Sequence, residues 1–129
     1  MKIEEMKIMI CDDSMLSRKK LKDFLATIGC TDVIEAADGA LAIENFEKHK
    51  PDLTLMDIVM PNLNGVNALE YIKKHYPDAK VVMTSSVGTQ ETLKDAIKLG
   101  ATDFLQKPID FDILKSLIEK LCKEAWSYV

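Results

Sequence analysis

The sequence predicts an α/β fold in which helices cover both faces of a five-stranded parallel sheet. Four short apolar runs and a fifth, shorter strand-like segment alternate along the chain with five segments whose apolar residues recur every three or four positions. This alternation is typical of parallel strands joined by right-handed crossover helices. The first run is continuously apolar, as a strand buried on both faces requires. A chain of 129 residues can bury about two-thirds of its surface in one core.

The apolar runs are the predicted strands. In chain order they are Lys7–Cys11, Val33–Ala36, Leu53–Met56, Val81–Thr84 and Asp103–Gln106. Turn-forming residues separate the third run from the segment after it, at Pro61–Asn64. Pro51 stands just before the third run, where its missing N–H ends any helix.

A helix is predicted after each strand. In chain order these helices are Ser14–Ile28, Gly39–Lys48, Gly65–His75, Thr89–Leu99 and Phe111–Tyr128. Asp38 is a suitable N-cap for the second helix, and Gly29 and Gly100 suit the ends of the first and fourth. The last helix has the broadest apolar stripe. It comprises Ile113, Leu114, Leu117, Ile118, Leu121, Cys122 and Ala125.

Composition narrows the class of protein. The chain is 47% hydrophobic and 29% charged with a net charge of −4, which is typical of a globular domain and argues against a nucleic-acid partner. No apolar run approaches the 18 or so residues of a membrane span, and the acidic start is unlike a signal peptide. We therefore expect a cytoplasmic protein without a membrane partner. Cys11, Cys30 and Cys122 are widely spaced and are predicted to be buried, reduced thiols.

Chemically capable side chains stand at the ends of four predicted strands. Asp12 and Asp13 follow the first, Asp57 the third, Thr84 and Ser85 the fourth, and Lys107 the fifth. Taken singly, each has an ordinary alternative: helix cap, loop acid, strand former or solvated lysine. Ligands of open α/β sheets bind at the carboxyl ends of the strands, so we expect these groups to converge on one site.

Such a site favours phosphoryl transfer. Three carboxylates repel one another, and Mg²⁺, which prefers oxygen ligands, would relieve that repulsion. A carboxylate can act as the nucleophile, while the metal and a lysine neutralise the phosphoryl oxygens. Asp57 is the natural nucleophile because it lies between the other groups. The turn after the first strand has no glycine and the chain has no GxxxxGK[ST], so no nucleotide cradle is indicated.

These motifs resemble the response-regulator receiver domain, of the stand-alone chemotaxis-regulator type. The resemblance covers essentially the whole chain. It is carried by Asp12-Asp13, the segment from Asp57 to Gly65, Thr84-Ser85 and Lys107-Pro108. It implies a flavodoxin-like doubly wound sheet of strand order 2-1-3-4-5, and one receiver domain over residues 1–129, with its core at about 7–125 and no effector domain.

The resemblance also implies residue roles. Asp57 would accept a phosphoryl group from a phosphohistidine on a sensor histidine kinase. Asp13, Asp57 and the Val59 carbonyl would bind Mg²⁺, with Asp12 helping through water. Lys107 would contact the phosphoryl group and Thr84 would swing its hydroxyl onto it. Phe104 matches an aromatic switch position, although a plain core role is equally open, and the Lys107-Pro108 peptide would be cis.

The implied output is a change of partner. The fourth helix, fifth strand and fifth helix would form the output face, where Lys94, Lys98, Lys115 and Lys120 form either a basic patch or a solvated surface. The partner would be a flagellar motor switch protein; a phosphorelay intermediate or phosphate sink is the alternative. An aspartate-nucleophile phosphatase and a flavodoxin-like cofactor binder are weaker readings. The chain would be a monomer or a phosphorylation-dependent dimer, with Trp126 either closing the core or anchoring an interface.

Overall fold

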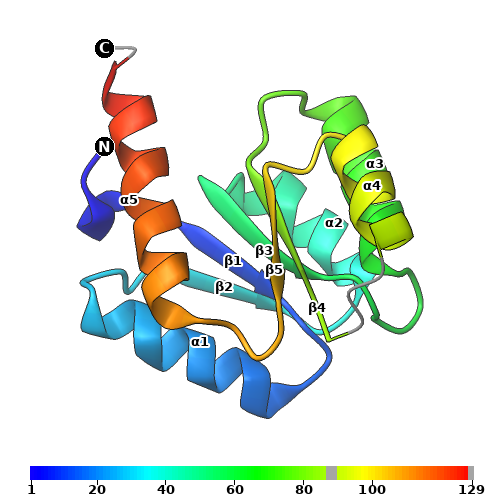
Figure 1. The fold of residues 1–129 in the computed structure, drawn as a ribbon, viewed down its shortest axis with the longest axis horizontal. Coiled ribbons are helices and arrows are strands. Elements are labelled where there is room, and N and C mark those ends of the chain that lie inside the picture. Colours follow the sequence, from blue (N-terminus) through cyan, green and yellow to red (C-terminus); the bar gives the residue numbers. More distant parts are fainter. Residues whose placement is uncertain (87–89, 128–129) are drawn as a thin grey trace.

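A computed structural model describes the backbone of residues 1–86 and 90–127 and the side chains of residues 1–86 and 91–124. The described strands are β1 (Ile8–Cys11), β2 (Val33–Ala36), β3 (Leu53–Asp57), β4 (Val81–Ser85) and β5 (Asp103–Gln106). All four strand pairs are parallel and the order is β2-β1-β3-β4-β5 (Figure 1). The predicted fold class and strand order are therefore confirmed.

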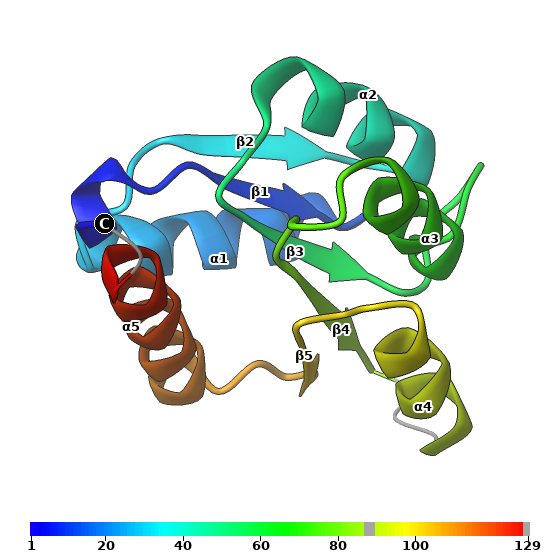
Figure 2. The ribbon, with the colours of Figure 1, turned by 90° about the horizontal axis from the view of Figure 1, so that it is seen from above.

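Helices cover both faces of this sheet. They are α1 (Met15–Thr27), α2 (Gly39–His49), α3 (Gly65–His75), α4 (Gln90–Lys98) and α5 (Phe111–Ser127). Helices α1 and α5 lie on one face, and α2, α3 and α4 lie on the other (Figure 2). Each face has its own apolar core. One packs Leu25 of α1 and Ile118 of α5 against β1 and β3, and the other packs Phe46 of α2 and Leu69 of α3 against the opposite side.

Polar caps start the first three helices. The Ser14 hydroxyl accepts a hydrogen bond from the Ser17 amide at 3.2 Å, so Ser14 caps α1 and frees the aspartates before it from that role. Asp38 caps α2 as predicted, accepting from Leu41 N at 2.8 Å. Each cap satisfies an amide that has no partner within the helix. The side chains at the ends of the strands are therefore available for other chemistry.

Several boundaries differ from the sequence expectation. Strands β3 and β4 each run one residue further, so that Asp57 and Ser85 lie within the sheet. Residues Ile3–Glu5 form a short 3-10 helix, η1, that the sequence analysis did not anticipate, and it packs against α5. The predicted start of the fourth helix at Thr89 lies outside the described residues.

The apolar stripe of α5 was predicted too broadly. Ile113 is 55% exposed, whereas Leu114, Leu117 and Ile118 are buried. Only one side of a helix faces the sheet that it covers, and Ile113 lies on the side of α5 that is turned away. The inclusion of Ile113 in the stripe that faces the sheet is therefore wrong, while the side chains of Ala125 and Trp126 lie outside the described ones.

The three cysteines are buried and none forms a disulfide, as predicted. Burial raises the pKa of Cys30 to about 11, with a smaller contribution from the nearby Asp32. Burial also raises the pKa of Cys11 far above its usual value. Neither thiol is therefore a thiolate near neutral pH. Among the helices the structure describes, none has the length and apolarity to cross a membrane.

Candidate functional site

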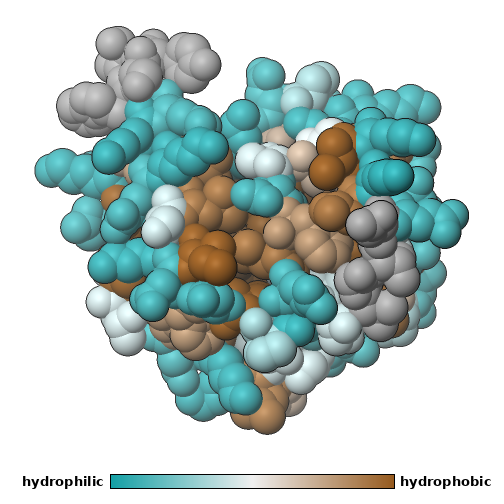
Figure 3. Space-filling view, viewed as in Figure 1, coloured by the Kyte–Doolittle hydropathy of each residue, from teal (hydrophilic) through white to brown (hydrophobic). Residues whose placement is uncertain are grey.

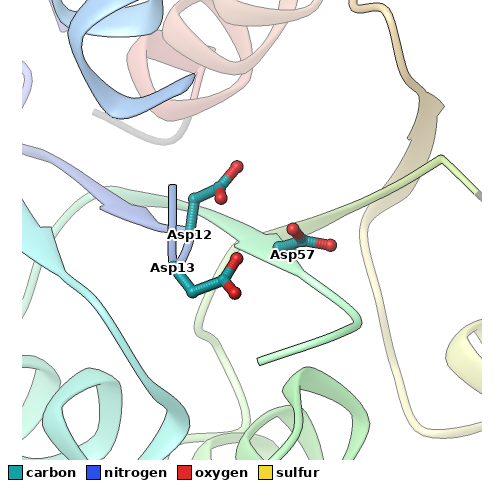
Figure 4. Close-up of side chains that lie close together, drawn as sticks. All are labelled: Asp12, Asp13 and Asp57. Atoms are coloured by element: carbon teal, nitrogen blue, oxygen red, sulfur yellow. The ribbon is translucent and has the colours of Figure 1, made fainter. Parts of the chain in front are cut away.

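Three carboxylates meet where β1 and β3 end. Asp12 and Asp13 directly follow β1, and Asp57 is the last residue of β3, the strand paired with β1. The three side chains point to the same side of the sheet end (Figure 4). One carboxylate oxygen from each lies within 4.8 Å of the others. Asp12 and Asp57 are buried and Asp13 is exposed, so the cluster opens to solvent on one side.

Lys107 bridges the two buried carboxylates. Its Nζ lies 2.6 Å from Asp12 Oδ2 and 2.9 Å from Asp57 Oδ2. Burial alone would lower the pKa of Lys107, but the hydrogen bonds to Asp12 and Asp57 outweigh it and raise the pKa above its usual value. The lysine is therefore a fixed positive charge beside Asp57 at neutral pH. The Lys107–Pro108 peptide that follows it is cis.

The turn between β1 and α1 is held at several points. Asp12 N donates to Ala36 O of β2 at 3.0 Å, and Asp12 Oδ1 accepts from Ser14 N at 2.9 Å. Arg18 Nη1 donates to the main-chain oxygen of Asp12 at 2.7 Å. Sequence reasoning did not single out Arg18, because an arginine near the start of an exposed helix has no local signal that distinguishes it from a solvated one.

The loop after Asp57 is fixed by close backbone packing. Gly65 N donates to Ile58 O at 2.8 Å, and a Cβ at Gly65 would overlap the Asp57 carbonyl oxygen. Only glycine therefore lets α3 start this close to the strand end. Val59 N donates a hydrogen bond to Asp57 Oδ1 at 3.3 Å, while the Val59 side chain is 63% exposed.

The remaining predicted residues lie on the neighbouring strands. Thr84 of β4 is the direct sheet partner of Asp57 and is buried. Phe104 of β5 is the sheet partner of Met83 and is partly buried against the core that α2, α3 and α4 cover. The structure thus brings Thr84 to the acid cluster and places Phe104 one strand further away.

A pocket of about 500 Å³ opens beside Lys107, between α1 and the segment leading into α5. Its lining combines polar and apolar side chains. They are Asp12, Ser17, Lys20, Leu21, Ser86, Lys107, Pro108, Ile109 and Phe111. The pocket borders the cluster at Asp12 and Lys107, and Asp57 is not among its lining residues.

The donor set suits a hard divalent cation. The cluster offers carboxylate oxygens and no thiolate or imidazole, and its open side leaves room for water, which is the environment that Mg²⁺ prefers. The same carboxylates, with a lysine and a threonine hydroxyl alongside, can also surround a phosphoryl group. The arrangement therefore supports metal binding and phosphoryl transfer at one place.

Comparisons with known proteins identify relatives of the chain. The family described as the response regulator receiver domain matches residues 8–119. The chemotaxis protein CheY of Bacillus subtilis is 41% identical over 88% of this chain and 95% of that protein. CheY of Thermotoga maritima is 37% identical over 91% of this chain and 98% of that protein. A crystal structure of the CheX-CheY-BeF3-Mg²⁺ complex from Borrelia burgdorferi matches with a TM-score of 0.83 and 30% identity, covering 88% of this chain and 87% of that one.

Proposed function

The chain belongs to the response regulator receiver domain family, and on that premise we propose that it is a stand-alone response regulator switched by phosphorylation of Asp57. Its likeness to CheY proteins over nearly their whole length supports a role in chemotaxis. The observation that carries the proposal is the contact between Lys107 and Asp57. It places a permanent cation 2.9 Å from a buried carboxylate in a metal-suited cluster.

We expect Mg²⁺ to be held by Asp13, Asp57 and the carbonyl of Val59, with Asp12 taking part through water. A bound metal ion would neutralise charge on the phosphoryl oxygens and offset the repulsion among the carboxylates. The chain's own residues supply the rest. Lys107 contacts a second face of the phosphoryl group, and the Thr84 hydroxyl donates to one of its oxygens after transfer.

The proposed step is an attack by Asp57 on a phosphohistidine of a sensor kinase. A carboxylate oxygen of Asp57 forms a bond to phosphorus as the phosphorus–nitrogen bond breaks. The imidazole leaves with the electron pair of that bond and takes a proton from solvent. The cluster opens to solvent at the exposed Asp13, so a donor can approach from that side.

A phosphatase would need an additional group. Enzymes that use an aspartate nucleophile turn over with a second aspartate two residues later as the general acid, and here Val59 holds that position. A valine side chain has no proton to give. The proposal is therefore a switch that keeps its phosphoryl group long enough to signal, rather than an enzyme acting on free phosphate esters.

The proposed output face comprises α4, β5 and α5. Figure 3 shows apolar side chains gathered in the hollow between α5 and α4, with polar side chains around it. Ile97 of α4 and Ile113 of α5 are each more than half exposed on these elements. The four lysines noted in the sequence are exposed as well. Exposed acidic side chains such as Asp95, Asp112 and Glu119 lie on the same helices, so the apolar centre, rather than a net basic charge, supports a protein partner such as a flagellar motor switch protein.

Phosphorylation can be tested with acetyl phosphate and Mg²⁺. We expect intact-protein mass spectrometry to show a gain of one phosphoryl group that requires Mg²⁺ and is absent from Asp57→Asn. Asp23→Asn is the matched control, because Asp23 is an exposed aspartate of α1 paired only with Lys19. A phosphoryl group on Asp57→Asn, or none on the wild type, would contradict the proposal.

A second experiment separates the possible outputs. Phosphorylated protein would be mixed with a motor switch protein or with a histidine phosphotransfer protein. Phosphorylation-dependent binding to the first supports the chemotaxis role. Loss of the phosphoryl group to the second supports a relay or a phosphate sink.

A further inference from the structure

Arg18 occupies an unusual place for a charged residue of a surface helix. Its side chain is only 13% exposed although it lies on α1, one turn after the cap. Nη1 donates to the main-chain oxygen of Asp12 at 2.7 Å, and Nε donates to Glu35 Oε1 of β2 at 3.1 Å. The planar guanidinium makes both bonds at once, which a lysine with its single nitrogen does far less readily.

The bond to Asp12 fixes a peptide inside the metal cluster. The Asp12 carbonyl belongs to the peptide unit that joins Asp12 to Asp13. The Asp12 side chain is already anchored by Ser14 N and Lys107. In the described part of the chain, the Asp13 carboxylate makes no hydrogen bond or ion pair of its own. The orientation of Asp13 therefore depends on its backbone, and Arg18 holds the peptide that precedes it.

Glu35 in turn orients Arg18. Glu35 lies on β2, and the carbonyl of its neighbour Ala36 accepts a hydrogen bond from Asp12 N. Both residues that Arg18 contacts, Glu35 and Asp12, are therefore held by the same part of the sheet. Lys22 also faces Glu35, at 3.7 Å, but reaches it from an exposed position and has no described bond to Asp12. Arg18 alone of these two cations links β2 to the acid cluster.

We propose that Arg18, oriented by Glu35, is a positioning residue for the divalent-metal site, holding the Asp12–Asp13 peptide so that the Asp13 carboxylate faces Asp57. This inference rests on the proposed function, because it assumes that the cluster binds Mg²⁺. Partners outside the ligand set commonly change metal affinity by about 10- to 100-fold when they are removed. Arg18 is expected to act in the same way through the backbone.

The test is an Mg²⁺ titration by calorimetry on the unphosphorylated protein. Arg18→Met is expected to raise the Kd for Mg²⁺ by about 10-fold. Arg18→Lys should restore part of that loss, and Glu35→Gln should weaken binding less than Arg18→Met. Lys22→Met is the matched control and should keep the wild-type Kd, since it removes a cation beside Glu35 without touching Asp12. Circular dichroism checks that each variant is folded.

A second readout is the amide resonance of Asp13 in the metal-free protein. It should shift in Arg18→Met and stay in place in Lys22→Met. An unchanged Kd in folded Arg18→Met and Arg18→Lys would overturn the inference, as would an equal loss in Lys22→Met. A wild type that binds no Mg²⁺ would instead overturn the proposed function itself, so the two failures are distinguishable.

Discussion

The side-chain amide of Asn62 donates a hydrogen bond to Asp38 Oδ2 across 2.9 Å. Asn62 belongs to the loop after β3, and Asp38 caps α2 through its other oxygen. Next to this bond, a Cβ at Gly39 would overlap the carbonyl oxygen of Leu63. The start of α2 and the loop that carries Val59 therefore form one packed unit beside the acid cluster.

Replacing Asp38 should destabilise this unit. Asp38→Ala removes both the cap bond to Leu41 N and the acceptor for Asn62, so we expect a loss of about 1 kcal/mol in the free energy of unfolding. Urea unfolding at neutral pH measures it. Asn62→Gly keeps the cap and suits the positive φ at this position, so it should cost less. Equal losses in the two variants would show that the cap contributes nothing.

The charge of Asp38 predicts an acid dependence. The backbone bond from Leu41 and the side-chain bond from Asn62 hold the pKa of Asp38 below its ordinary value of 3.8. Its contribution to stability is therefore complete above that value and is lost as the pH falls through the lower, folded-state pKa. Asp38→Asn keeps a capping oxygen without a titrating group. The stability difference between wild type and Asp38→Asn should shrink below about pH 4, and a constant difference would contradict the prediction.

Thr54 offers a stabilising substitution. It is fully buried in β3, and its hydroxyl is the one buried side-chain polar atom without a hydrogen-bond partner among the residues described. A buried hydroxyl without a partner costs about 1 kcal/mol or more. Thr54→Val should therefore raise the urea midpoint with an unchanged slope. Thr54→Ser, which keeps the hydroxyl and removes a methyl group, should lower it.

Asp13 should affect stability and metal binding in opposite directions. Its carboxylate is exposed, lies beside two others and has no described partner. Asp13→Asn should raise stability without metal by about 0.5 kcal/mol, because a like charge is removed. Added Mg²⁺ should then stabilise the variant less than the wild type. Thermal unfolding without and with Mg²⁺ measures the metal-free stability and the stabilisation by the metal. The control Asp23→Asn should be stabilised by Mg²⁺ as much as the wild type.

The buried thiols predict slow chemical labelling. Burial keeps Cys30 protonated at pH 8, because its pKa is about 11, and the other two thiols are buried too. A thiol reagent should therefore react with the native protein far more slowly than with the protein in urea, where all three cysteines are open. Lys19→Cys, at an exposed site of α1, should add one fast thiol. Rapid reaction of native wild type would contradict the burial of these side chains.

Most of the acid cluster could be predicted from the sequence, because parallel strands end at one edge and their last residues must meet there. The convergence of Asp12, Asp57 and Lys107 could be predicted without knowing any individual contact. The pairing of Lys107 with Asp12 was not predicted, since a strand order alone does not specify which carboxylate a flexible lysine reaches.

Residues that act across elements were beyond sequence reasoning. Arg18 of α1 contacts Glu35 of β2, and that contact depends on how α1 lies over the edge of the sheet. The exposure of Ile113 likewise depends on how α5 is rotated against β5. The spacing of apolar residues determines that rotation only to within about one residue position. In both cases local pattern identified the helix correctly and left its orientation unspecified.

The position of β1 between β2 and β3 has a consequence for how the molecule folds. Asp12 and Asp57 become neighbours only after the chain has passed through β2 and α2 and returned to pair β3 with β1. Pairings between distant segments form slowly, because a long loop must close first. A nascent chain therefore cannot bring Asp12 and Asp13 together with Asp57 until β3 has emerged and paired with β1, and the Lys107 contacts form later still, after β5.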